Sequence, residues 1–152
     1  GSRAVTVNFP LHPGWEFLAL VPDFNLATTL ARSVLPTDIP RPDAVYNISH
    51  GAMVLKALEL GDEKLLRNAM QDRLHQNYRK SLIQDYDQIE GLVRTTGAAF
   101  CLSGAGPTLL CLTQNPMVRE RLIEKLPTVT EANWEILPLH VEFQGARVIS
   151  TQ

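Results

Sequence analysis

Apolar and polar residues change their spacing several times along this chain, and the first forty positions combine strand-like and helix-like patterns. Residues 3–9 alternate as in a short strand, and residues 15–21 form an apolar run of strand length. Leu30 and Val34 lie four positions apart, which favours a short helix over residues 28–34. Proline follows each of these three elements, so the pattern predicts two strands and one helix here.

A helical period begins near residue 42. Pro42 and Asp43 are typical of a first helical turn, and we expect a helix from there to Leu60 that ends at Gly61. Its apolar stripe consists of Val45, Ile48, Ala52 and Leu55.

Two further helices are expected before residue 98. Asp62 can cap the first of them, whose apolar positions are Leu65, Leu66, Ala69, Met70 and Leu74. Asp85 and Gln88 have the spacing of a capping box, so the second helix should begin there and end at Gly97.

After residue 97 the period is that of strands. Residues 98–102 and 108–112 are apolar runs joined by a glycine-rich connection, which predicts a buried hairpin. A helix is expected over 115–127, closed by its last residue, a proline, and residues 134–141 and 146–149 resemble two final strands. There are too few helices to alternate with every strand, so we predict one α+β domain with an antiparallel sheet covered by helices on one face.

Composition and charge exclude several classes of protein. The chain has 152 residues, of which 45% are hydrophobic and 20% charged, as in an ordinary globular domain. Fourteen Lys and Arg oppose 16 Asp and Glu and are scattered, so we expect no nucleic-acid or membrane partner. No apolar run approaches the roughly 20 residues of a membrane-spanning helix, and we expect a soluble, cytoplasmic protein.

Cysteines and histidines give no sign of a metal site. Cys101 and Cys111 lie in apolar stretches and are interpreted as buried reduced thiols. The four histidines are dispersed and fall in no metal-ligand motif, so no metal ligands are predicted within the chain.

The glycine-rich connection is the first candidate for chemistry. Gly104 and Gly106 permit positive φ and a close approach of a ligand, with Ser103 and Thr108 offering hydroxyls at the two ends. An apolar strand follows where a phosphate-binding loop would open a helix. A plain hairpin turn without a ligand therefore remains an alternative.

Two arginine-containing segments are the other candidates. Residues 72–79 combine two arginines with Asp72, His75 and Tyr78, and arginine suits the recognition of a carboxylate or phosphate. Arg32 is flanked by apolar residues and can be either an anion clamp or a paired structural residue. No catalytic triad can be assembled, so the residues alone indicate anion binding without identifying a reaction.

Three segments, taken in order, resemble the C-terminal half of the homoserine kinases, a family of the GHMP small-molecule kinase superfamily. They are residues 31–36, 72–79 and 102–109, and the likeness extends over residues 5–150. The resemblance implies a ferredoxin-like α+β fold and transfer of the γ-phosphate of ATP, with Mg²⁺, to the hydroxyl of L-homoserine on the route to threonine.

The resemblance also assigns roles to individual residues. Arg32 and Arg79 correspond to residues that hold the amino-acid substrate, and Asp72, His75 and Tyr78 would support Arg79. The glycine-rich third motif of the family corresponds to Ser103, Gly104, Ala105, Gly106, Pro107 and Thr108. No catalytic residue is assigned within this chain.

The principal phosphate-binding loop and the Mg²⁺-binding acid of the family lie in its N-terminal half, and neither is present here. Residues 1–2 resemble the remnant of a cleaved tag, so we expect residues 3–152 to be a separated C-terminal domain, inactive alone and binding neither ATP nor Mg²⁺ tightly. The alternatives are the same domain of another GHMP kinase and a non-catalytic binding or dimerisation module. A homodimer is also left open, because separation would expose a sheet edge or face.

Overall fold

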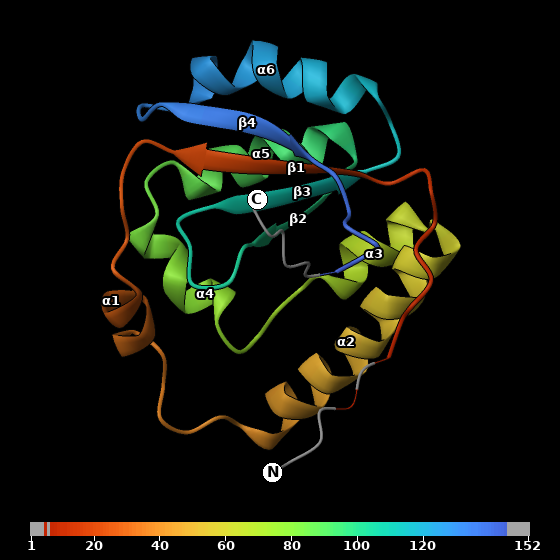
Figure 1. Ribbon diagram of the computed structural model, residues 1–152. Coiled ribbons are helices and arrows are strands. Elements are labelled where there is room, and N and C mark those ends of the chain that lie inside the picture. The colour runs from red at the N-terminus through yellow and green to blue at the C-terminus, as the bar shows by residue number, and fades with distance from the viewer. Residues whose placement is uncertain (1–4, 6, 146–152) are drawn as a thin grey trace, which may run out of the picture.

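The computed structural model describes residues 5 and 7–145 (Figure 1). From residue 16 on, the order of elements follows the predicted pattern, with one short helix and one 3₁₀ turn added after residue 75. The elements are β1 (Glu16–Pro22), α1 (Thr28–Ser33), α2 (Arg41–Leu60), α3 (Glu63–Ala69), α4 (Gln76–Arg79), the 3₁₀ turn η1 (Lys80–Leu82), α5 (Tyr86–Thr96), β2 (Ala99–Leu102), β3 (Leu109–Thr113), α6 (Met117–Val129) and β4 (Trp134–Leu139).

The four strands form one antiparallel sheet in the order β2-β3-β1-β4. β1 lies between β3 and β4, with Leu18 opposite Cys111 on one side and opposite Pro138 on the other. α5 precedes β2 and α6 precedes β4, and the two helices pack against each other. This is the arrangement of a ferredoxin-like sandwich, and it confirms the predicted α+β class.

The main core lies between the sheet and the helices α5 and α6. Alternate residues of each strand point to this side, so Leu18 and Leu20 of β1 and Leu109 of β3 are buried there. From the helices, Ile89 and Val93 of α5 and Val118, Leu122 and Leu126 of α6 complete the core.

The second face of the sheet is also covered in part, which corrects the prediction of a single covered face. Trp15, Ala99 and Leu112 form a smaller core with Ala57 of α2 and Leu66 of α3. Toward β4 this face stays open, where Leu137 is 37% and Leu139 is 45% exposed. The reason is topological: α2 and α3 reach only the half of the sheet nearest β2 and β3.

Helix ends follow the predicted signals at three places. Gly61 and Gly97 adopt left-handed φ values of 70° and 81° at the ends of α2 and α5. The Asp62 carboxylate accepts a hydrogen bond of 2.8 Å from the Leu65 amide at the start of α3.

The apolar stripe predicted for α2 is not buried. Val45 is 56%, Ile48 77% and Leu55 40% exposed, while the side that packs inward carries Ala57. The apolar contacts of α2 with the smaller core come from its C-terminal half, so local periodicity predicts the wrong face of the helix.

The structure differs from three other local predictions. Residues 5 and 7–9 are not in a strand, and the rest of the predicted strand 3–9, like the predicted strand 146–149, lies outside the described residues. α6 continues through Pro127 to Val129, because a proline in the last turn removes only one hydrogen bond. Asp85 precedes α5 but makes no capping hydrogen bond.

The Asp85 side chain instead holds the turn that leads into β4. Asp85 is 8% exposed and has a left-handed φ of 63°. Its Oδ2 accepts hydrogen bonds from the Glu131 amide at 3.1 Å, the Ala132 amide at 2.9 Å and the Trp134 indole at 3.3 Å. A buried carboxylate thus joins the start of α5 to the end of α6, 46 or more residues away.

We predict that Asp85→Ala lowers the free energy of unfolding by about 3 kcal/mol, since it removes charge-assisted hydrogen bonds and leaves buried donors unpaired. Asp85→Asn, which tolerates the left-handed backbone and keeps one acceptor, should cost less. Urea unfolding of the chain provides the measurement, with the exposed Asp87→Ala as control. Equal losses for Asp85→Ala and Asp87→Ala would contradict this role.

Candidate functional site

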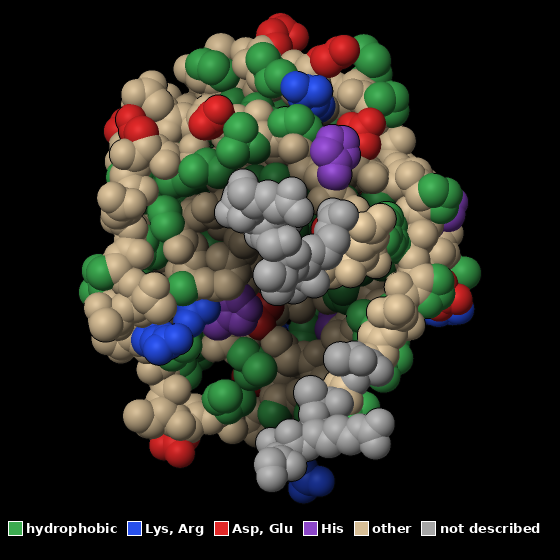
Figure 2. Space-filling model, in the orientation of Figure 1, with side chains coloured by type: hydrophobic (Ala, Val, Ile, Leu, Met, Phe, Trp, Pro, Cys, Tyr) green, Lys and Arg blue, Asp and Glu red, His purple; other side chains and the backbone are tan. Residues whose placement is uncertain are grey.

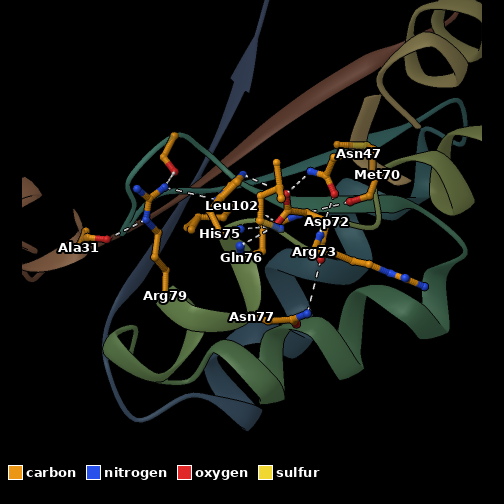
Figure 3. Close-up of polar contacts among 12 residues, drawn as sticks. Ala31, Asn47, Met70, Asp72, Arg73, His75, Gln76, Asn77, Arg79 and Leu102 are labelled. Atoms are coloured by element: carbon orange, nitrogen blue, oxygen red, sulfur yellow. Dashed lines mark hydrogen bonds and ion pairs between the residues drawn. The ribbon is translucent and has the colours of Figure 1, made fainter. Parts of the chain in front are cut away.

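Arg79 lies where three segments distant in the sequence meet (Figure 3). Its Nε donates to the Ala31 carbonyl of α1 at 2.8 Å. Its Nη1 donates at 3.0 Å to the carbonyl of Gly104 in the glycine-rich connection between β2 and β3, residues 103–108, called the glycine hairpin below. The same Nη1 lies 3.3 Å from Nδ1 of His75. The three candidate segments of the sequence therefore share one site.

The glycine hairpin is held in shape by its own backbone. The Ser103 amide donates to the Thr108 carbonyl at 2.9 Å, and the Gly106 amide donates to the Ser103 carbonyl at 3.1 Å. Gly106 has a φ of 87°, and a Cβ there would lie 3.0 Å from Leu102 Cδ1 and 3.1 Å from Ile83 Cδ1. The positive φ favours glycine at this position, and a Cβ would also press against the ends of these two side chains.

Gly104 is different, because a Cβ there would meet no atom within 4 Å. Its φ of 61° nevertheless favours glycine, and this conformation presents the carbonyl to Arg79. Ser103 and Gly104 are exposed, so the tip of the hairpin is accessible while its base is packed.

The Asp72 carboxylate organises the loop between α3 and α4. One oxygen, Oδ2, accepts from three successive backbone amides, those of Leu74, His75 and Gln76, at 3.1, 2.7 and 2.7 Å. The other, Oδ1, accepts from the Asn47 side chain of α2 at 2.6 Å. Burial alone would raise the pKa of Asp72, but the hydrogen bonds that the carboxylate accepts outweigh it and hold this pKa below its ordinary value.

His75 connects Asp72 to Arg79. A guanidinium can only donate, so Nδ1 of His75 must accept from Arg79, and a neutral ring carries its hydrogen on Nε2. Nε2 faces Asp72 Oδ1 at 3.7 Å, which is too long for a hydrogen bond but close enough for electrostatic attraction. His75 therefore lies beside Arg79, and Asp72 lies on the other side of His75, while their support of Arg79 in substrate binding stays a prediction.

Arg32 and Tyr78 are held less firmly. Arg32 is exposed, and within residues 5 and 7–145 its side chain has no hydrogen bond or ion pair. Tyr78 is 40% exposed and its hydroxyl makes no hydrogen bond to another described residue, so its supporting role stays a prediction. Figure 2 shows basic and histidine side chains side by side in the region of α1 and α4, next to a hollow of the surface.

Two residues of the network have no individual signal in the sequence. Asn47 lies 25 positions before Asp72, on a helix whose predicted role was apolar packing. Gln76 lies inside the segment 72–79, but its side chain contacts the start of the hairpin 26 positions later. Only the tertiary structure brings these amides to their partners.

The arrangement suits recognition of an anion. Arg79 is fixed through Nε and Nη1, while its Nη2 makes no hydrogen bond with the described residues, and the Arg32 guanidinium is free. Arg79 thus offers a preorganised guanidinium and Arg32 an exposed one, and a guanidinium is suited to binding a carboxylate or phosphate.

Other chemistry has less support in the part of the chain that the structure describes. No group of three or more metal-ligating side chains occurs among these residues. Both cysteines are free thiols, and burial raises the pKa of each to about 12, so neither is a ready nucleophile. None of the described helices is long and apolar enough to cross a membrane.

We predict that Asp72→Asn destabilises the chain by about 2 kcal/mol at pH 7 and by less at pH 3. A carboxyl whose pKa is lowered by folding contributes its full stability above its unfolded value near 3.9, and this contribution is lost as the pH falls. Urea unfolding at the two pH values tests this, with Asp87→Asn as an exposed control. A loss that is equal at pH 3 and pH 7 would refute the electrostatic account.

Curated relatives of this chain are homoserine kinases. The chain is 41% identical over 138 residues to that of Leifsonia xyli, covering 91% of this chain and 42% of the relative. It is 44% identical over 146 residues to that of Trichodesmium erythraeum, covering 93% of this chain and 48% of the relative. The chain therefore spans less than half the length of these relatives.

A solved structure and a family profile agree with these matches. The crystal structure of homoserine kinase from Cytophaga hutchinsonii has the same fold, with a TM-score of 0.79, 21% identity, and coverage of 89% of this chain and 44% of that one. The family profile described as GHMP kinases C terminal matches residues 54–132. Since this match covers more than half of the chain, the chain belongs to the GHMP kinase C-terminal family.

Proposed function

We propose that this chain is the substrate-binding half of an ATP-dependent homoserine kinase. The full-length protein would transfer the γ-phosphate of ATP to the side-chain hydroxyl of L-homoserine in the cytoplasm, a step toward threonine. The single observation that carries the proposal is the junction of Arg79 with α1 and the glycine hairpin. The 41% and 44% identity to homoserine kinases supports this substrate.

The proposed role of the arginines follows from the chemistry of the substrate. L-homoserine carries a carboxylate, which Arg32 and the Nη2 edge of Arg79 would bind. Holding the carboxylate orients the hydroxyl at the other end of the molecule toward the γ-phosphate. Phosphoryl transfer requires mainly positioning and charge stabilisation, so this contact would contribute directly to the rate.

The glycine hairpin, residues 103–108, would form one wall of the substrate site. Its exposed tip lets substrate or phosphate approach the backbone closely, and Arg79 holds its orientation through Gly104. By the family resemblance, ATP and Mg²⁺ would be bound chiefly by an N-terminal half that precedes this domain.

Exposed apolar surface is consistent with such a second half. Val45, Ile48 and Leu55 lie along α2, and Leu137 and Leu139 lie on the open face of the sheet. A stripe of this kind costs free energy in water unless another surface covers it. We propose that the N-terminal half covers α2, and a second copy of the protein is the alternative partner.

The first prediction from this proposal concerns the reaction. The full-length protein should phosphorylate L-homoserine with ATP and Mg²⁺ in preference to mevalonate or sugars, as measured by coupled ADP release over a substrate panel. The 152-residue chain alone should show no turnover. A preference for mevalonate would assign the domain to another GHMP kinase, and no turnover with any alcohol would favour a non-catalytic module.

A second prediction concerns the free arginine. In the full-length protein, Arg32→Gln should raise KM for homoserine about 30-fold, equivalent to the loss of about 2 kcal/mol from one charged contact, without changing the thermal unfolding midpoint. KM for ATP should stay unchanged. Arg94→Gln, on an arginine whose side chain is 74% exposed, is the matched control. Wild-type kinetics in Arg32→Gln would remove Arg32 from the site.

A further inference from the structure

Gln76 makes a two-sided contact that the proposed binding site does not use directly. Its side-chain Oε1 accepts from the Leu102 amide at 2.7 Å, and its Nε2 donates to the Met70 carbonyl at 3.2 Å. Its own amide donates to Asp72 at 2.7 Å. One side chain therefore joins the loop after α3 to the last residue of β2 (Figure 3).

The Leu102 amide depends on this contact because of its place in the sheet. β2 is an edge strand, paired only with β3. Since Ser103 donates to Thr108 across the hairpin, the alternation of an antiparallel ladder turns the Leu102 amide away from β3. Gln76 supplies the acceptor that the sheet cannot, one residue before the glycine hairpin begins.

Gln76 and Arg79 hold the hairpin at two neighbouring points. The two residues lie three positions apart on α4, so their side chains project from the same side of one helical turn. Gln76 contacts Leu102, and Arg79 contacts the Gly104 carbonyl two residues further on. The short helix therefore lies across the start of the hairpin and is attached to it by two hydrogen bonds.

α4 is in turn fixed to the rest of the domain. The Asp72 carboxylate holds its first turn, and Asn47 holds Asp72 from α2 while its own Oδ1 accepts from the Arg73 amide at 2.9 Å. If the contact between Gln76 and Leu102 were lost, α4 would keep this anchor but could shift relative to the hairpin. The Arg79 guanidinium would then lose its fixed orientation toward Gly104.

From this geometry we infer that Gln76 is a positioning residue for substrate binding: it fixes α4 on the glycine hairpin and so orients Arg79. The inference rests on the proposed function for its kinetic consequence. Gln76 itself contacts neither of the two proposed carboxylate-binding groups, and its effect would pass through Arg79 and the backbone of the hairpin.

Kinetics of the full-length protein test the inference. Gln76→Met, of similar size but without polar atoms at the amide positions, should raise KM for homoserine at least tenfold and leave KM for ATP within twofold. Gln76→Glu keeps an acceptor for the Leu102 amide and loses the donor to Met70, so its KM should lie between those of wild type and Gln76→Met. Gln71→Met, on an exposed glutamine of the same loop, is the matched control and should leave both constants unchanged.

Comparison of the KM values for homoserine and for ATP distinguishes a positioning role from a general loss of stability. A merely structural role would lower the unfolding temperature of Gln76→Met but leave KM for homoserine at its wild-type value in the folded enzyme. That result, or an equal rise of KM for homoserine and ATP, would overturn the inference.

Amide hydrogen exchange gives a readout that does not depend on the reaction. In Gln76→Met, exchange of peptides covering residues 100–108 should accelerate at least tenfold, while peptides from β1 should exchange as in wild type. If the wild-type protein fails to phosphorylate homoserine, the proposed function fails, and unchanged exchange over residues 100–108 would then overturn the role of Gln76 separately.

Discussion

The site depends on one guanidinium that is shared between two backbone carbonyls. Arg79 reaches 48 positions back to Ala31 and 25 positions forward to Gly104, and neither contact is a side-chain ion pair. Carbonyl oxygens can accept from a guanidinium only where the backbone is held in the right orientation. The backbone at Ala31 and at Gly104 must therefore be held by other contacts for Arg79 to join them, and the pairing of β2 with β3 holds the hairpin.

Arg79 is held by two carbonyl oxygens and an imidazole rather than by a carboxylate. Asp72 is the nearest acid in the network, but it is occupied by backbone amides and by Asn47, and it faces Arg79 only through His75. Within residues 5 and 7–145, Arg79 thus has no direct carboxylate partner that would neutralise its charge. A direct salt bridge would stabilise the loop but would also compete with an incoming anion. Orientation through carbonyls and an imidazole avoids that competition.

Local signals in the sequence predicted the elements well and the long-range contacts poorly. The glycines that end α2 and α5, the Asp62 cap and the apolar hairpin depend on neighbouring residues only, so pattern and composition are sufficient for them. The exposed stripe of α2 and the role of Asp85 depend on which surfaces meet after folding. Residue chemistry makes the hairpin and the segment with Arg79 candidates, and family resemblance gives them roles. Asn47 and Gln76, in contrast, are single amides whose partners lie 25 and 26 positions away.

The two candidate arginines differ in a way that bears on how a substrate would be held. Arg79 is already fixed, so using its free nitrogen would cost little side-chain entropy, and it can define the position of a carboxylate. Arg32 is exposed and would lose rotamer freedom on binding, so its net contribution would come from charge. The same difference predicts unequal effects of mutation: loss of Arg32 would weaken substrate binding alone, whereas loss of Arg79 would also release the hairpin. In such a site the side chain of Arg79 loses its conformational entropy on folding, through the contacts of Gln76 and Asp72, rather than on substrate binding.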